Sequence, residues 1–453
     1  MHAKRNNARE TKHKFTFLVA FWLLNVFLCE EFLFHAFVTK CVWPDPYLEE
    51  DILEVHHVAI ISNPTLADQS TFFIASEPGP LLFIVETYCD LYLKKAYRRV
   101  LSKRPDAIVI LGDVIDGGRE GDELEFSESL ERYMSVFSQP IQPGVEPVAV
   151  LHVPGDRDVG LGSAINEEIV QRYTESFDPL NQIAELGSFS LVIANAPSLV
   201  TDDREAMHYL DTMKFIKLIQ NEEKTEEIKI LFTHLPLYRT LILDNDECGP
   251  FRSTSSKPFE CTEDSCLPED VSARITNDIK FVHVFSGHDN DWCETVHVDD
   301  NDRLLPETTI GTLSWMQGNW WPSFALVTLY SRAPYVSVAK CTLPSYILIF
   351  IWYSLCSVVT IFLLFPFPES LRSLVPSVLR SWMQQAKGKE AKAVLDLELD
   401  PVASASETEK QTRTRRRWLA RIRGDGPGLW PLAMLFLYTF SWYVFWVMIE
   451  FRV

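Results

Sequence analysis

The sequence is poor in positive charge and lacks several common signals. Its 453 residues include 42 Lys and Arg against 62 Asp and Glu, so the formal net charge is −20 and the pI is about 5.0. Phosphate backbones repel such a chain, and nucleic acid is therefore not an expected partner. No Cys-x-x-Cys pair occurs, which disfavours a thiolate metal site. The length exceeds that of one ordinary domain.

The apolar residues are concentrated in three long runs, so the mean hydropathy is near zero despite the charge. The first run, 15–38, is long enough to cross a bilayer of roughly 30 Å. Basic residues in 1–14 precede it and no small-x-small cleavage site follows, which predicts a cytoplasmic N-terminus and a membrane helix rather than a signal peptide. The runs 345–366 and 429–451 predict two more membrane helices. The linker between them, 367–428, is predicted to be cytoplasmic because of its arginines, which are Arg413, Arg415, Arg416, Arg417, Arg421 and Arg423.

This topology places residues 39–344 in the lumen as one domain, where disulfides are permitted. Seven of the nine cysteines fall there, namely Cys41, Cys89, Cys248, Cys261, Cys266, Cys293 and Cys341. An odd number leaves at least one unpaired. Cys41 and Cys341 each lie just outside a predicted membrane helix, and we expect a disulfide between them. The sequence leaves the other pairings open.

Short apolar runs alternate with helical stretches in the predicted lumenal domain. Strands are predicted where Val and Ile are enriched between turn signals, at Val55–Ser62, Ala107–Gly112, Val148–Val153, Ile228–Thr233 and Phe281–Ser286. Helices are predicted between them, for example at Leu81–Lys103 and Met207–Glu222. This alternation predicts an α/β domain with largely parallel strand pairing.

A ligand-type residue follows each predicted strand, and in several cases it stands beside glycine. The segments are Asn63-Pro64-Thr65, Gly112-Asp113-Val114-Ile115-Asp116, Gly155-Asp156-Arg157-Asp158, Thr233-His234 and Gly287-His288-Asp289-Asn290. Sites in open α/β sheets form at the carboxyl ends of strands. Carboxylate and imidazole ligands meeting there predict a site for Mn, Fe or Zn.

These motifs, in this order, resemble those of calcineurin-like metallophosphoesterases. Flanking segments resemble the membrane-bound branch that removes ethanolamine phosphate from the glycans of GPI anchors in the early secretory pathway. They are Cys41-Val42-Trp43-Pro44, His234-Leu235-Pro236-Leu237-Tyr238-Arg239, Ser314-Trp315, Pro322-Ser323-Phe324 and Lys340-Cys341-x-Leu343-Pro344. The resemblance covers roughly residues 15–365. It implies an α/β metallophosphoesterase sandwich. The three apolar runs predict that one N-terminal and two C-terminal membrane helices anchor this domain.

For the chemistry, the resemblance implies a centre of one or two divalent ions, usually Mn²⁺. Asp113 is similar to the carboxylate that bridges two metals, and His234 and His288 match ligands of the second metal. Asp156 stands where the family has a ligating asparagine, and a carboxylate there can also bind a metal. Arg157 stands where the family has a histidine that contacts the phosphate and protonates the leaving group, so Arg157 is the candidate catalytic residue. For Asp116 and Asp158 we favour hydrogen bonding in turns over metal ligation.

Four positions depart from the family pattern: Asn63, Thr65, Arg157 and Asn290. The first metal position, which would use Asn63, Thr65 and Asn290 with Asp113, is depleted of good ligands. An arginine can hold a phosphate through two hydrogen bonds, but it stays protonated and is a poor general acid. A single-metal site is therefore expected.

The sequence motifs are compatible with two functions. One is a metal-dependent phosphodiesterase of the endoplasmic reticulum or cis-Golgi membrane that acts on the GPI glycan or on GPI-anchored proteins. The alternative is an inactive relative that binds GPI glycans or cargo in the lumen. A membrane protein that uses the fold only as a scaffold is a third reading, because fold supports function only by analogy.

Overall fold

The computed structural model describes residues 2–45, 54–71, 80–139, 146–221, 228–239, 261, 265–331 and 335–364. The predicted third membrane helix at 429–451, the linker at 367–428 with its arginines, and Cys248 lie outside these ranges. The chain divides into two compact units, Met1–Leu28 with Leu348–Ile449, and Cys29–Ile347 with Glu450–Val453.

The first unit contains α1 (His2–Phe27) and most of α9 (Tyr346–Leu364). Two tryptophans join these helices: Trp22 Nε1 donates to Thr360 Oγ1 at 3.1 Å, and Trp352 Nε1 donates to Asn25 Oδ1 at 2.8 Å. Within the described ranges, one helix is long and apolar enough to cross a membrane, at Phe15–Thr39. The apolar part of α9, Tyr346–Ile361, is shorter. The two C-terminal crossings thus stay predictions.

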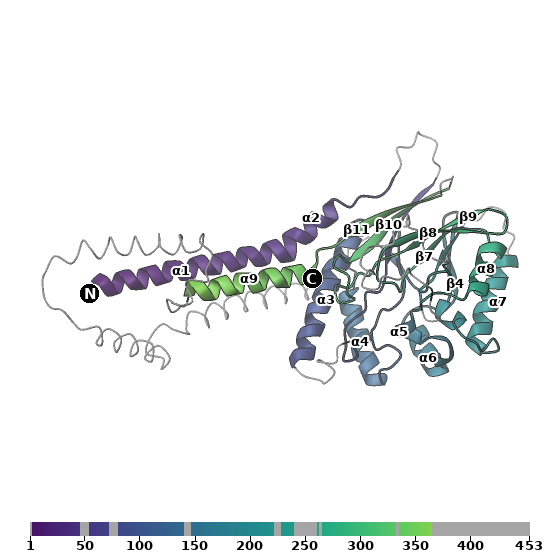
Figure 1. The fold of residues 1–453 in the computed structure, drawn as a ribbon, viewed down its shortest axis with the longest axis horizontal. Coiled ribbons are helices and arrows are strands. Elements are labelled where there is room, and N and C mark those ends of the chain that lie inside the picture. Colours follow the sequence, from purple (N-terminus) through teal and green to yellow (C-terminus); the bar gives the residue numbers. More distant parts are fainter. Residues whose placement is uncertain are drawn as a thin grey trace. The chain divides into compact units, whose positions relative to one another are not determined.

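The second unit is built around two sheets (Figure 1). The five-stranded sheet has the order β11-β10-β1-β2-β3, formed by Val336–Thr342, Ser323–Tyr330, Val55–Ile61, Ala107–Ile110 and Ala149–His152. The six-stranded sheet has the order β4-β5-β6-β7-β9-β8, formed by Gln182–Leu186, Phe189–Ile193, Ile228–Phe232, Phe281–Ser286, Leu304–Thr309 and Cys293–Val298.

Apolar side chains from both sheets form one buried core, which makes the unit a sandwich. Val58, Val109 and Val327 of the first sheet pack in one cluster with Phe189 and Phe232 of the second. A second cluster joins the six-stranded sheet to α7 and α8. The remaining described helical segments are η1 (Leu28–Phe32), α2 (Leu33–Thr39), α3 (Pro80–Leu101), α4 (Glu123–Val136), α5 (Asp156–Val159), η3 (Gly162–Ala164), α6 (Glu167–Ser176), η4 (Ala196–Leu199), α7 (Met207–Asn221) and α8 (Glu269–Asp278).

All five predicted strands and both predicted helices are present, but the pairing is mixed rather than largely parallel. β1–β2–β3 and β5–β6–β7–β9 are parallel, whereas β10, β11, β4 and β8 add antiparallel edges. The sequence pattern missed β8 because Cys293–Val298 is not a continuous apolar run and includes Glu294 and His297. It missed β9 because that strand contains Pro306.

The acidic residues that interrupt the first apolar run have partners on α3. Glu30 is 3% exposed and pairs with Lys95 Nζ at 2.7 Å, while Tyr346 Oη donates to the same carboxylate at 2.7 Å. Glu31 pairs with Arg99 at 3.2 Å. A buried carboxylate needs such partners, so this ion pair explains how an acid is tolerated at the end of an apolar helix.

The disulfide expected between Cys41 and Cys341 is present, with Cα atoms 5.5 Å apart. Cys261 and Cys266 form a second one, and Cys293 is also disulfide-bonded. Cys89 is a buried free thiol, in agreement with the odd number of cysteines in this part of the chain.

Candidate metal centre

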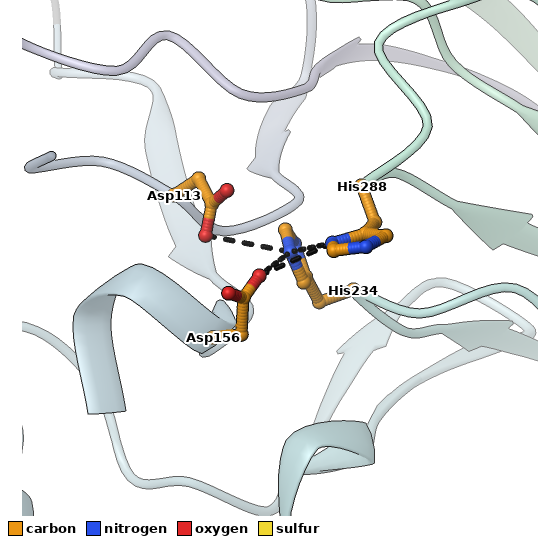
Figure 2. Close-up of side chains that lie close together, drawn as sticks. All are labelled: Asp113, Asp156, His234 and His288. Carbon is orange, nitrogen blue, oxygen red and sulfur yellow. Dashed lines mark hydrogen bonds and ion pairs between the residues drawn. The ribbon is translucent and has the colours of Figure 1, made fainter. Parts of the chain in front are cut away.

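Four candidate ligands meet where the carboxyl ends of the two sheets face each other (Figure 2). Asp113 and Asp156 follow β2 and β3 of one sheet, and His234 and His288 follow β6 and β7 of the other. One ligand atom from each residue lies within 4.8 Å of every other. Asp113 and His234 are buried, while the side chains of Asp156 and His288 are 16% and 24% exposed. The cluster is therefore open to solvent on the side of Asp156 and His288.

The backbone is held in an uncommon conformation around this cluster. Gly112 has φ +80°, and a Cβ atom there would lie 2.6 Å from His234 Nδ1. Asp113 and His288 also have positive φ, 52° and 62°. Non-glycine residues adopt such angles at a cost of order 1–3 kcal/mol, and they gather at functional sites. The loops therefore adopt strained backbone angles at the positions where the ligand side chains turn towards one another.

His234 is oriented by a hydrogen bond to the main chain. Its Nδ1 lies 2.7 Å from Leu111 O, and because a carbonyl only accepts, Nδ1 carries the proton. Nε2 then faces Asp156 Oδ1 at 3.0 Å and His288 Nδ1 at 3.3 Å. This arrangement, with one ring nitrogen bonded to a carbonyl and the other facing the site, is typical of metal-ligating histidines.

The distances between ligand atoms fit one divalent ion. Ligands about 2.1 Å from an ion lie about 3.0–3.4 Å apart in octahedral or tetrahedral geometry. The separations are 3.0 Å from His234 Nε2 to Asp156 Oδ1, 3.1 Å from His288 Nδ1 to the same oxygen, and 3.4 Å from His234 Nε2 to Asp113 Oδ1. Two carboxylates and two imidazoles suit Mn, Fe or Zn.

Burial and charge shift the pKa values of the cluster in opposite directions. Burial raises the pKa of Asp113, and the charge of His234 offsets only part of that rise. Burial also disfavours the ionised form of Asp156, but hydrogen bonds from His234 and His288 outweigh it and lower its pKa well below the usual range. Burial disfavours charged His234, yet Asp113 and Asp156 outweigh it and raise its pKa to about 9.

Metal binding is therefore expected to strengthen with pH. With its pKa raised to about 9, His234 is protonated at neutral pH in the metal-free protein, and an incoming ion must displace that proton. The apparent affinity should rise by about tenfold per pH unit up to pH 9 and level off above it, which a chelator competition titration at several pH values would measure. An affinity that does not change between pH 7 and pH 9 would contradict this expectation.

Two arginines border the cluster. Arg157, the candidate catalytic residue, donates its backbone N–H to Asp113 Oδ1 at 3.1 Å, and its guanidinium pairs with Asp116 and lies 3.5 Å from Asp113 Oδ2. Arg119 Nη1 lies 3.5 Å from Asp156 Oδ2. The sequence motifs did not single out Arg119, although Gly117 and Gly118 before it are the signal of a turn that could bring it to the site.

Asp116 and Asp158 have roles other than ligation. Asp158 is buried and accepts hydrogen bonds from Val114 N at 2.9 Å and Gly155 N at 3.0 Å, so it joins the two loops that carry Asp113 and Asp156. Asp116 pairs with Arg157. These hydrogen bonds agree with the turn role expected from the sequence.

At the first metal position, which is depleted of good ligands, Asn63 and Asn290 are hydrogen-bonded to each other. Asn63 Nδ2 donates to Asn290 Oδ1 at 2.9 Å, and Asn63 Oδ1 accepts from Ser62 Oγ at 2.8 Å. Thr65 is fully buried, its hydroxyl has no partner, and its φ of 44° is unusual for a β-branched residue. Asn63 Oδ1 also accepts from His288 N at 3.3 Å, and Thr65 N donates to Asp113 O at 2.9 Å, so the structure brings these residues to the edge of the cluster.

The family model for calcineurin-like phosphoesterases matches residues 87–291. This range contains all four residues of the cluster. This part of the chain is thus similar to the calcineurin-like phosphoesterases.

Curated relatives extend beyond that domain. Cell division control protein 1 of Saccharomyces cerevisiae is 22% identical over 85% of this chain and 81% of its own length. Metallophosphoesterase 1 of Xenopus laevis is 26% identical over 71% of this chain and 82% of its own length. Among solved structures, a dimetal phosphatase from Danio rerio is similar over 64% of this chain and 99% of that chain, with 13% identity and a TM-score of 0.36. The relatives, the family model and the Asp/Asp/His/His cluster together support a metal-dependent phosphoesterase.

Proposed function

We propose that the protein is a metal-dependent phosphodiesterase that removes ethanolamine phosphate from the GPI glycan in the endoplasmic reticulum or cis-Golgi membrane. The observation that carries the proposal is the convergence of Asp113, Asp156, His234 and His288 on one point within a phosphoesterase domain. The substrate and the compartment rest on the resemblance of the flanking motifs to the membrane-bound branch.

In this proposal, Asp113, Asp156, His234 and His288 hold one divalent ion, with Mn²⁺ as the expected metal. Such an ion supplies Lewis-acid activation of the phosphoryl group and of the attacking water. Arg157 and Arg119, each beside one of the carboxylates, are placed to bind the non-bridging phosphate oxygens. Arg157 stays protonated, so it orients the phosphate and stabilises its charge without donating a proton.

The hydrogen bond between Asn63 and Asn290 favours the alternative function. It occupies the place where an active two-metal relative would bind its other ion, and the guanidinium of Arg157 is already paired with Asp116. An inactive domain could still bind the phosphate of a GPI glycan or a GPI-anchored cargo protein through its single ion and its arginines.

Phosphodiesterase activity separates the two functions. The full chain, purified in detergent and loaded with Mn²⁺, should release ethanolamine phosphate from a GPI glycan and hydrolyse bis(p-nitrophenyl) phosphate, more slowly than a two-metal enzyme. Both activities should disappear with a chelator and return with Mn²⁺. Binding of the glycan with no turnover of either substrate would favour the inactive relative.

The proposed topology places the phosphoesterase domain in the lumen. Lys4, Arg5, Arg9, Lys12 and Lys14 precede the apolar helix at Phe15–Thr39, and positive charge stays in the cytoplasm. In sealed microsomes, protease added outside should therefore leave the domain intact, and detergent should expose it to digestion. Digestion without detergent would contradict this orientation.

A further inference from the structure

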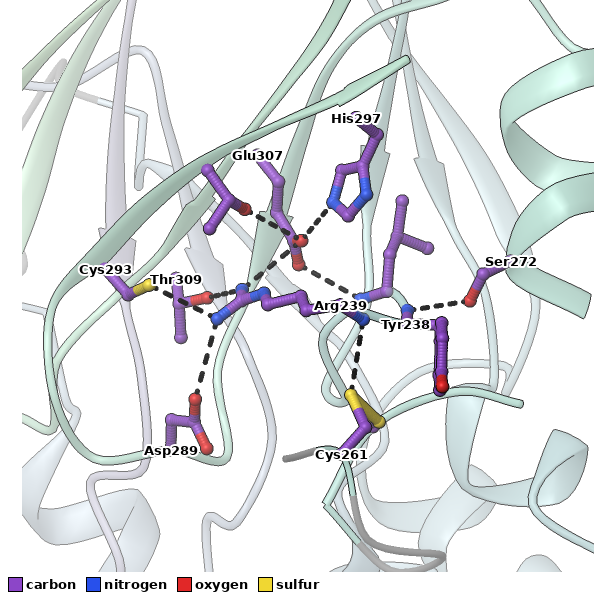
Figure 3. The surroundings of a disulfide bond; sticks show 12 residues. Tyr238, Arg239, Cys261, Ser272, Asp289, Cys293, His297, Glu307 and Thr309 are labelled. Carbon is purple, nitrogen blue, oxygen red and sulfur yellow. Dashed lines mark hydrogen bonds and ion pairs between the residues drawn. A yellow bond between two sulfur atoms is a disulfide. The ribbon is translucent and has the colours of Figure 1, made fainter. Parts of the chain in front are cut away.

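The loops that carry His234 and His288 are joined by a buried network that the proposed reaction does not use (Figure 3). Its centre is Glu307 on β9, which is 1% exposed. Glu307 Oε1 accepts from Leu237 N at 3.1 Å and from Ser286 Oγ at 2.7 Å. Leu237 lies three residues after His234, and Ser286 lies two residues before His288. One carboxylate oxygen therefore ties both histidine loops to β9.

Arg239 makes a second link between the same loops. It ends the described part of the loop that begins at His234, and its side chain is 3% exposed. Its guanidinium lies 3.2 Å from Glu307 Oε2, and 3.8 Å from the carboxylate of Asp289, the residue that directly follows His288. It also donates to Thr309 Oγ1 and to Cys293 Sγ. A guanidinium is the cation suited to such a place, because its planar fork reaches several acceptors at fixed angles.

Arg239 and His297 stabilise the charge of Glu307. Burial disfavours ionised Glu307, but the charge of Arg239 and a hydrogen bond from His297 outweigh it and lower the pKa of Glu307 to about 2. His297 Nε2 lies 2.7 Å from Glu307 Oε2. Glu307 is therefore ionised at every physiological pH. A buried ion pair with several hydrogen bonds fixes the geometry of what it contacts more firmly than apolar packing does.

We propose that Arg239 and Glu307 are positioning residues that set the separation of His234 and His288 and thereby the affinity and geometry of the metal centre. This inference rests on the proposed function, because it assumes that the two histidines bind a metal. The residues act through the loops: neither of their charged groups contacts a ligand atom of the cluster in an interaction described above.

The test uses the full chain in detergent with Co²⁺ as the probe, because the visible absorption of Co²⁺ reports ligand geometry. Arg239→Lys keeps the charge but removes the fork, and Ser286→Ala removes only one hydroxyl bound to Glu307. Outer-shell changes typically cost 10–100-fold in metal affinity. We expect Arg239→Lys to weaken Co²⁺ binding by about tenfold or more and to alter the absorption bands, and Ser286→Ala to have a smaller effect in the same direction.

The matched control is His283→Gln. His283 is buried on β7, where its Nε2 lies 2.9 Å from Thr308 Oγ1 on β9 and its ring stacks on Phe285, and it makes no described side-chain hydrogen bond to Arg239, Glu307 or either histidine loop. Burial lowers its pKa to about 4, so it is neutral and Gln is a fair replacement. His283→Gln should lose thermal stability but keep the wild-type Co²⁺ spectrum and affinity.

The outcomes separate this inference from the proposed function. Wild-type Co²⁺ binding with an unchanged spectrum and affinity in both Arg239→Lys and Ser286→Ala would overturn the positioning role and leave the metal site in place. Losses no larger than those of His283→Gln would also overturn it. Wild-type protein that binds no Co²⁺ would overturn the proposed function and this inference together.

Discussion

Replacing His234 with Gln is expected to abolish tight metal binding and, with it, phosphodiesterase activity. His234 is fully buried, its Nε2 faces Asp156 and His288, and no other described side chain can take its place. Because loss of an outer-shell partner alone costs 10–100-fold, loss of a ligand should weaken binding by more than about a hundredfold. The measurement is Mn²⁺ affinity by chelator competition, followed by phosphodiesterase activity at saturating metal.

His152→Gln is the matched control for this change. Like His234, His152 is buried and paired with a carboxylate. Its Nδ1 lies 2.8 Å from Asp178 Oδ2, and its Nε2 lies 2.6 Å from Tyr133 Oη. Its replacement should lower thermal stability without changing the affinity for Mn²⁺. Equal metal binding in His234→Gln and the wild-type protein would refute the assigned ligand set.

The sequence predicted the candidate site better than the sheets that hold it. Asp113, Asp156, His234 and His288 each follow a strand rich in apolar residues, and a strand end followed by a ligand-type residue is a local pattern. Strand order is not local: β9 lies between β7 and β8 in the six-stranded sheet, and only tertiary packing decides this. The antiparallel edges that made the pairing mixed were missed for the same reason.

The sequence pattern also could not predict contacts between residues that lie far apart in the chain. Glu30 interrupts an apolar run, and its pairing with Lys95, 65 residues later, follows from the packing of the helix end on α3. Arg119 and Glu307 have no motif of their own, and their importance comes from what they contact. Cys41 and Cys341 were the exception, because each lies beside a predicted membrane helix and the two helix ends were expected to meet the same domain.

The native protein is expected to bind about one metal ion per chain. The second position would depend on Asn63, Thr65 and Asn290, which are neutral, and on a share of the charge of Asp113. Two divalent ions at short distance repel each other, and a shared carboxylate alone does not offset that repulsion. The hydrogen bond between Asn63 Nδ2 and Asn290 Oδ1 at 2.9 Å would also have to break before a second ion could enter. The guanidinium of Arg157, 3.5 Å from Asp113 Oδ2, supplies positive charge there instead.

Restoring ligands should therefore raise the metal content of the purified protein. The triple variant Asn63→Asp, Arg157→His and Asn290→His is expected to bring the ratio of metal to protein from about one towards two. The backbone permits these changes, because Asn63 and Asn290 have φ of 45° and 60°, a region that Asn, Asp and His adopt more readily than other residues. Asn319→Asp is the control for charge alone, since Asn319 contacts Asn290 O and Asp291 and belongs to neither metal position; its metal content should not change. Two tightly bound ions in the native protein, measured by elemental analysis, would contradict the single-metal centre and would require ligands other than those identified here.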